Sequence, residues 1–296
     1  MSLRLSMITA AAALLLGTAA HAAPDWDAVG KALGKPGAMQ AGGVYKVSLP
    51  RTDLEVTLDG VPLKAGFALG SWVAFEPMGD GAMAMGDLVL THSEVNPVMS
   101  KLEEGGFEVT ALHNHLLRSA PATMYMHVEG HGDPVRLAQA LHAALSLSRT
   151  PFTAPAPPPT AAAPPVGLDV PSLDQVLGAK GKVNGGVLQY SIPRRDQITS
   201  GGMAVPPPMG TATAINFQPT GAGRAAITGD FVLEASEVNP VIKALRSHGI
   251  EVTAVHNHML SDEPRIFFMH FWANGDAGAL AAGLAAALSQ TNSQRG

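Results

Sequence analysis

The chain has 296 residues, of which 46% are hydrophobic and 15% are charged. This composition supports packed cores and excludes a chain that is disordered along its whole length, and the length corresponds to about two domains. The net charge of -5 and the lack of a basic footprint exclude a typical nucleic-acid-binding protein, so we expect no nucleic-acid partner. Because cysteine is absent, disulfides, thiolate catalysis and zinc-thiolate sites are also excluded.

Residues 1–22 have the pattern of a secretory signal peptide. Arg4 gives the positive start, an apolar run follows over residues 7–20, and residues 20–22 form a small-x-small cleavage site. The apolar run is shorter than the roughly 20 residues that a membrane-spanning helix needs. We therefore predict a chain with no stable membrane span, beginning near Ala23 after cleavage and located in the periplasm or secreted.

The sequence after the signal is an internal duplication. Residues 86–133 align without a gap with residues 229–276, at an offset of 143 (229 − 86), and 25 of the 48 aligned positions are identical. A repeat of this size is a whole domain rather than a unit of a solenoid. We predict a first repeat domain over residues 23–149 and a second over residues 168–296.

Residues 150–167 join the two repeats and are rich in proline and alanine. Such a segment does not support a helix or a central strand, so we expect an extended linker. We also expect the two repeats to pack as an internal pseudo-dimer. The reason is the predicted helix over residues 277–288, which is nearly all apolar and should therefore be buried.

The first repeat shows the predicted elements most clearly. A short helix begins near Asp25, and strands follow at residues 44–49, 54–58, 72–76 and 83–91. Asn96 and Pro97 suit the cap and first position of a helix ending at Glu104. Strands at 107–117 and 124–129 and a helix at 134–147 complete the repeat. This order predicts an α+β fold of two tandem homologous domains, each a mostly antiparallel sheet with helices packed on one face.

Six histidines occupy matching positions in the two repeats. The matched pairs are His113 with His256, His115 with His258, and His127 with His270. His113 and His115 are two residues apart on a predicted strand and so face the same side. His127 lies on the next strand, which returns antiparallel, so the three imidazoles should converge. Three imidazoles without thiolates favour a Zn or Cu ion, and the sequence therefore predicts one metal site in each repeat.

Glu94 and Glu237 are matched acidic residues that precede the predicted Asn-Pro helix start. Each carboxylate could serve as a fourth metal ligand, as a partner that orients an imidazole, or as a general base. The alternative is a structural role, in which the carboxylate stabilises the N-terminus of the helix.

Two further features are interpreted as structural. Asp87 and Asp230 each follow a glycine, and we expect them to serve a turn. Met83 and Met85 are two residues apart, which could indicate a copper site, but the second repeat has alanines at residues 225–226 in that region. We therefore expect these methionines to pack within the strand.

The motifs of Ser93–Val98, His113–Leu117 and Met126-His127, each repeated 143 residues later, identify a resemblance. Together with the signal peptide they resemble the LppY/LpqO family of bacterial secreted proteins. That family has no assigned activity, and its namesakes look like mycobacterial lipoproteins. The resemblance implies an exported protein, although this chain has no cysteine to carry a lipid anchor.

Three functions remain open from the sequence. The first is an exported metal-binding protein with a histidine-rich transition-metal site in each repeat. The second is a metal-dependent hydrolase, in which Glu94 or Glu237 is the base that activates a metal-bound water in an open cleft. The third is a non-metal module that binds a small-molecule or cell-envelope ligand, although three Trp and three Tyr disfavour a wide aromatic platform for sugars.

Overall fold

The computed structural model describes residues 24–153 and 166–295. The predicted signal peptide over residues 1–22 and most of the predicted linker lie outside the described residues. The prediction of an α+β fold is confirmed, because each repeat forms a mostly antiparallel sheet with helices. No helix of the described residues is both long enough and apolar enough to cross a membrane.

The first repeat contains, within the described residues, a six-stranded sheet in the order β1-β2-β5-β6-β8-β7 with antiparallel neighbours. Its strands are β1 (Ala38–Met39), β2 (Tyr45–Pro50), β5 (Gly70–Met78), β6 (Gly81–Thr91), β7 (Glu108–His113) and β8 (Thr123–Gly132). Its outer helices are α1 (Trp26–Leu33), α3 (His92–Glu104) and α4 (Pro134–Leu145), and a 3-10 turn, η1 (Ala41–Gly43), precedes β2.

The second repeat has the equivalent six-stranded sheet, in the order β15-β17-β14-β13-β10-β9 within the described residues. Its strands are β9 (Lys182–Asn184), β10 (Val187–Pro193), β13 (Ala212–Gly221), β14 (Arg224–Glu234), β15 (Glu251–His256) and β17 (Ile266–Asp276). Its outer helices are α5 (Val170–Leu177), α6 (Ala235–Ser247) and α7 (Ala277–Leu288).

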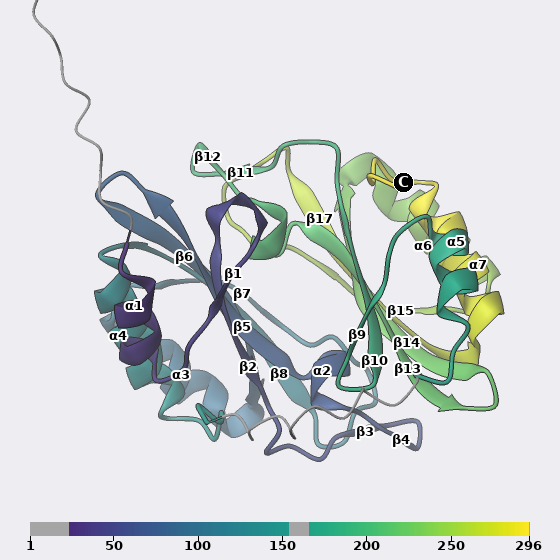
Figure 1. Ribbon diagram of the computed structural model, residues 1–296, viewed down its shortest axis with the longest axis horizontal. Coiled ribbons are helices and arrows are strands. Elements are labelled where there is room, and N and C mark those ends of the chain that lie inside the picture. Colours follow the sequence, from purple (N-terminus) through teal and green to yellow (C-terminus); the bar gives the residue numbers. More distant parts are fainter. Residues whose placement is uncertain (1–23, 154–165, 296) are drawn as a thin grey trace, which may run out of the picture.

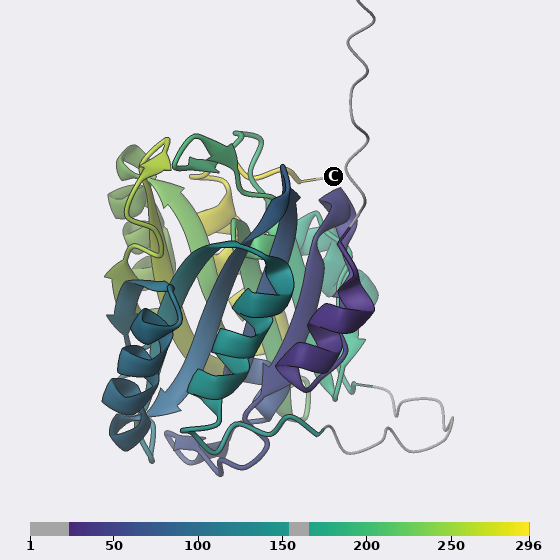
Figure 2. The ribbon, with the colours of Figure 1, turned by 90° about the vertical axis from the view of Figure 1, so that its left-hand side faces the viewer.

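The two sheets face each other between two outer layers of helices (Figure 1). Seen from the side of the first repeat, α1, α3 and α4 lie in front of the sheet that they cover (Figure 2). Central strands such as β6 are therefore buried on both faces. Leu88 and Leu90 pack towards the helices, whereas Val89 packs towards the other repeat, as the alternation of side chains along a strand requires.

Two apolar clusters lie between the sheets and combine residues of both repeats. The tryptophan cluster includes Val89, Leu116, Tyr125 and Trp272. The methionine cluster includes Met83, Met85, Met209 and Met259. The repeats thus pack face to face, but the helix that suggested this packing has another place: α7 packs on the outer face of its own sheet, with α5 and α6.

Two connecting segments reach from one repeat across to the other. Residues 51–69 carry β3 (Thr57–Leu58), β4 (Val61–Pro62) and α2 (Ala65–Ala68). Residues 194–211 carry β11 (Thr199–Ser200), β12 (Met203–Ala204) and η2 (Pro207–Met209), and β11 also pairs with β16 (Asp262–Glu263). The first segment is held by Gln218, which accepts a hydrogen bond from the Lys64 amide at 2.8 Å and donates one to the Pro62 carbonyl at 2.7 Å. The second accepts a hydrogen bond at 2.6 Å from the Lys46 ammonium, at the Pro208 carbonyl.

Among the predicted boundaries that differ from those of the structure, two concern residues singled out in the sequence. The helix predicted to be capped by Asn96 begins five residues earlier, because Thr91 and Glu94 form a capping box in which each side chain bonds to the other residue's amide. Pro97 therefore lies inside α3. The strand predicted to reach residue 117 ends at His113, so His115 lies in the loop that follows β7.

Candidate metal centre

Strand pairing brings two histidines of the first repeat to the inner face of its sheet. On β8, His127 pairs with Asp87 of β6 on one side and with Ala111 of β7 on the other. His113, at the end of β7, pairs with Tyr125 of β8. Since residues two apart on a strand share a face, His113, His127 and Asp87 all point to the other repeat.

The second repeat repeats this register. His270 pairs with Asp230 and with Ala254, and His256 pairs with Phe268. The third histidine of each repeat lies in the loop after β7 or β15 and stacks on an aromatic ring of the neighbouring strand. The ring centroids are 3.3 Å apart for His115 and Tyr125, and 3.4 Å apart for His258 and Phe268.

The matched histidines meet at the interface as one group, which we call the histidine cluster. Its members are His113, His115, His127, His256, His258 and His270. The nearest rings belong to different repeats: the centroid distances are 3.5 Å for His113–His256, 3.5 Å for His115–His270 and 3.6 Å for His127–His258. Within a repeat, the ring centroid of His113 or His256 lies 4.8–5.0 Å from those of the other two histidines. The structure thus brings the predicted histidines of both repeats together in one cluster with pseudo-two-fold symmetry.

Every imidazole of the histidine cluster has a buried Nε2 atom without a hydrogen-bond partner among the described residues. The Oδ1 atoms of Asp87 and Asp230 are likewise buried and without a hydrogen-bond partner among the described residues. Buried polar atoms without partners are rare in native proteins. Eight such atoms, six nitrogens and two oxygens, at one place in the described structure indicate a site for a bound group.

The opposite ring nitrogen of three histidines contacts a backbone carbonyl. His270 Nδ1 lies 2.8 Å from the Gly229 oxygen, His256 Nδ1 lies 3.3 Å from the Asn257 oxygen, and His113 Nδ1 lies 3.4 Å from the Asn114 oxygen. A ring that donates its Nδ1–H to a carbonyl carries its lone pair on Nε2. This is the tautomer in which metal-binding histidines are commonly held.

The described residues contain four overlapping sets of possible metal ligands. Within each set, one ligand atom from every residue lies within 4.8 Å of the others. Two sets join the repeats: His113, His115, His256 and His270; and His113, His127 and His258. Two lie within a repeat: Asp230, His256, His258 and His270; and Asp87, His115 and His127. Imidazole and carboxylate ligands at this spacing could hold a transition-metal ion.

Burial dominates the electrostatics of the site. Desolvation lowers the pKa of His113 to about 4, and desolvation together with the charge of His113 lowers the pKa of His256 to about 3. The pKa values of the other four imidazoles lie well below the usual 6.5, first through burial and then through neighbouring histidines. The imidazoles are therefore neutral at ordinary pH, as metal ligands must be.

Burial acts in the opposite direction on the two aspartates. It raises the pKa of Asp87 to about 7, against the attraction of Lys46. It also raises the pKa of Asp230 well above 3.8, and the charge of Asp87 raises it further. A cation between these carboxylates and the imidazoles would relieve the cost of burying their charge.

Glu94 and Glu237 lie elsewhere, and neither belongs to the ligand sets of the described residues. The Arg51 guanidinium donates to both oxygens of Glu94, at 2.8 and 3.1 Å, and the amides of Thr91 and Arg149 donate at 2.8 and 2.9 Å. Arg194 holds Glu237 in the same way. Among the roles considered from the sequence, these contacts match the structural one, in which each carboxylate stabilises the N-terminus of a helix.

The carboxylates beside the imidazoles are Asp87 and Asp230, for which a turn was the expected place. Both lie in the interior of a central strand, directly opposite His127 and His270. A signal for them was present in the sequence: each is the only charged residue in the interior of its strand.

A family model described as Domain of Unknown Function (DUF1259) matches residues 27–147 and 171–290. No curated protein matches the chain. Among solved structures, the chain is similar to the trimeric bacterial microcompartment shell protein PduB, with 14% identity, 86% of this chain and 89% of that chain covered, and a TM-score of 0.21. It is also similar to EtuB from Clostridium kluyveri, with 10% identity, 86% and 88% covered, and a TM-score of 0.21. Such low scores support no argument about function.

Proposed function

The chain belongs, in both repeats, to the family described as Domain of Unknown Function (DUF1259), and we propose that it is an exported protein that binds transition-metal ions between the repeats. The observation that carries this proposal is the set of buried Nε2 atoms of the histidine cluster, which lack hydrogen-bond partners among the described residues and face one another across the interface. Zn²⁺ and copper ions fit best, because the site offers imidazole and carboxylate ligands without thiolate.

The symmetry of the cluster suggests two ions in each chain. His113 and His256 stack on each other and occur in sets on both sides of the pseudo-two-fold axis. On one side lie His115 and His270, which we call the first position, and on the other lie His127 and His258, the second position. Because each imidazole offers one Nε2, His113 and His256 can complete one position each, with Asp87 and Asp230 nearby as oxygen ligands.

The burial of the ligand atoms favours binding over hydrolysis. A hydrolytic site needs an open coordination position that a substrate can reach. Here all the Nε2 atoms are buried, and Glu94 and Glu237, the expected bases, are held by arginines away from the cluster. A non-metal ligand is disfavoured for the same reason, since the partnerless atoms face each other at metal-ligand spacing.

Metal analysis of the purified mature chain tests the proposal. After incubation with Zn²⁺ or Cu²⁺ and dialysis, we expect two ions for each wild-type chain. His113→Gln, which removes one central imidazole, should lower this number. His92→Gln, at an exposed position on α3 outside the cluster, is the matched control and should retain both ions. A wild-type chain without stoichiometric metal would refute the proposal.

Export is supported by the sequence pattern of residues 1–22 and by the resemblance to the LppY/LpqO family. N-terminal sequencing of the protein recovered from the periplasm or the medium should give a chain that starts near Ala23. Recovery of the uncleaved chain from the cytoplasm would contradict this part of the proposal.

A further inference from the structure

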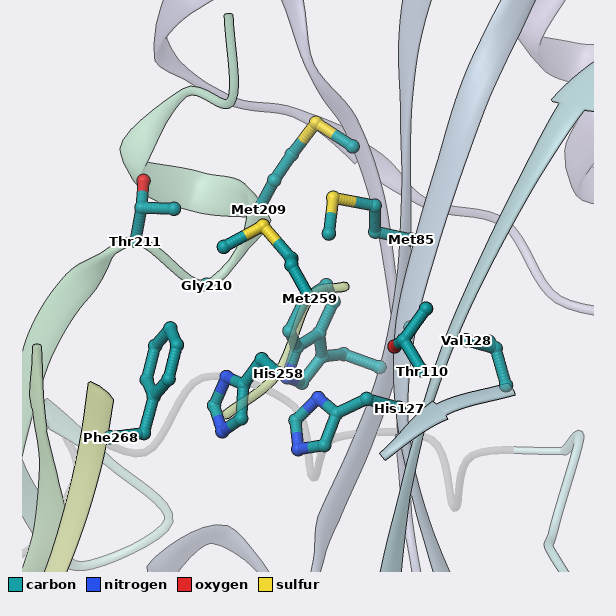
Figure 3. A pocket seen from close by; sticks show the side chains of 12 residues that line it. Met85, Thr110, His127, Val128, Met209, Gly210, Thr211, His258, Met259 and Phe268 are labelled. Atoms are coloured by element: carbon teal, nitrogen blue, oxygen red, sulfur yellow. The ribbon is translucent and has the colours of Figure 1, made fainter. Parts of the chain in front are cut away.

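Three methionines gather beside the second position. Met85 comes from β6, Met209 from η2 and Met259 from the loop after β15, and all three are buried. Together with His127 and His258 they line a cavity of about 10 Å³, in which the sulfur atoms lie on one side of the two imidazoles (Figure 3). The cavity is about the size that holds one water molecule or one ion.

The first position lacks these sulfurs, although the two positions are related by the pseudo-two-fold axis. The residue equivalent to Met85 is Thr228, and the residue equivalent to Met259 is Leu116, each 143 positions away. The tryptophan cluster, with Leu116, Tyr125 and Trp272, packs on that side. Since carbon side chains fill the equivalent space there, packing alone does not require methionine at the second position.

A hydroxyl in the same cavity shows a second difference between the two sides. Thr253 donates a hydrogen bond to the His115 carbonyl at 2.6 Å. The equivalent hydroxyl, of Thr110, is buried in the methionine-lined cavity and has no hydrogen-bond partner among the described residues. The side chains of His127 and His258 also line this cavity, and their Nε2 atoms have no hydrogen-bond partner among the described residues. The cavity therefore combines soft sulfur ligands with buried polar atoms that need a partner.

We propose that Met85, Met209 and Met259, with His127 and His258, form a binding site that is selective for Cu(I). Thioethers are soft ligands that favour Cu(I) over Zn²⁺, whereas imidazole binds both ions. All these ligands are uncharged, so a monovalent ion in this buried cavity leaves less charge to bury than a divalent ion does. The inference rests on the proposed function and adds that the two positions differ in the metal that they prefer.

Two measurements on the full mature chain test this site. X-ray absorption of the wild-type chain loaded anaerobically with one equivalent of Cu(I) should show sulfur as well as nitrogen around copper. In competition with a Cu(I) chelator such as bicinchoninate, the triple variant Met85→Leu, Met209→Leu and Met259→Leu should bind Cu(I) at least about tenfold more weakly. Zinc binding by this variant should be unchanged. Met269→Leu, at a buried position on the outer face of the second sheet, is the control and should match the wild type.

The outcomes separate the two proposals. A wild-type chain that binds neither Zn²⁺ nor copper refutes the proposed function. A chain that binds these metals, but surrounds Cu(I) with nitrogen alone or binds it equally well in the triple variant, refutes only the methionine site. The absorption measurement uses the wild-type chain, so it decides the question even when the triple variant does not fold.

Discussion

Arg51 and Arg194 occupy equivalent places and join the end of a central strand to the helix that follows it. The side chain of Arg51 is fully buried and donates to the Val89 carbonyl of β6 at 2.7 Å and to Glu94 in the first turn of α3. Arg194 bonds to Val232 and Glu237 in the same way. Each arginine thus holds its strand at a carbonyl two residues beyond Asp87 or Asp230, outside the histidine cluster.

The buried pair makes stability depend on pH. Burial alone would raise the pKa of Glu94, but Arg51 and the amides of Thr91 and Arg149 lower it below the usual 4.5. A carboxylate with a lowered pKa stabilises the fold above pH 4.5, and this contribution is lost as pH falls through its folded-state pKa. Glu94→Gln should therefore reduce the free energy of unfolding at pH 7 by about 2 kcal/mol, less than a complete loss of a buried pair, because Arg51 keeps Asp53.

Urea titrations at pH 7 and pH 3 measure this effect. The difference between Glu94→Gln and the wild type should shrink at the lower pH. Glu103→Gln, at an exposed position on the same helix, should match the wild type at both values. Because Glu94 does not contact the histidine cluster, Glu94→Gln should also bind the same number of metal ions; loss of metal from a folded variant would restore Glu94 as a ligand or base.

At the scale of elements, the two connecting segments hold one repeat to the other. The side chain of Gln218 is buried and bonds both to the Lys64 amide and to the Pro62 carbonyl of the opposite repeat. Gln189 adds a bond to the Gly66 carbonyl at 2.8 Å. Residues 51–69 are thus attached to the second sheet by hydrogen bonds between its glutamine side chains and main-chain groups of the segment, as well as by apolar packing.

Removing one of these bonds should loosen the segment. Gln218→Ala removes two part-buried hydrogen bonds, each of which contributes about 0.5–1.5 kcal/mol to stability. We expect faster amide hydrogen exchange over residues 61–65 and a lower melting temperature. Gln290→Ala, at an exposed position after α7, is the control. Unchanged exchange over residues 61–65 would show that packing alone holds the segment.

The order of elements could be predicted from the periodicity of apolar residues, and the matched histidines from the internal duplication. Both signals can be read directly along the sequence. The start of α3 was missed although Thr91 and Glu94 spell a capping box, since Asn96-Pro97 is an equally familiar helix start. The meeting of His115 with His270 could not be predicted, because it depends on how two sheets pack, and one sequence does not specify that orientation. The grouping of Met85 with Met209 and Met259 could not be predicted for the same reason, because these residues also meet between the two sheets.

At the scale of the whole molecule, the candidate metal centre lies at the interface between the repeats. The closest imidazole pairs each take one ring from each repeat. An ion bound by both repeats stabilises the folded, packed state but not the unfolded chain, by RT ln(1 + [L]/Kd). Metal binding should therefore raise the stability of both repeats together.

Calorimetry with and without metal checks this coupling. With free Zn²⁺ at about 100 times its Kd, we expect a stabilisation of about 2.7 kcal/mol for each ion, and EDTA should reverse it. The metal-dependent rise in melting temperature should be smaller for His113→Gln than for the wild type. A melting temperature that is the same with Zn²⁺ and with EDTA would contradict the coupling.

The face-to-face arrangement of two repeats in one chain also bears on how the protein can evolve. In a homodimer of single repeats, every substitution appears on both sides of the symmetry axis, so the two half-sites must change together. Fusion removes this constraint, and the residue at the position equivalent to Met85 is now Thr228. A duplicated gene of this kind can keep the shared ligands while each half acquires its own preference, and relatives in which the two halves have diverged differently would have different metal selectivities.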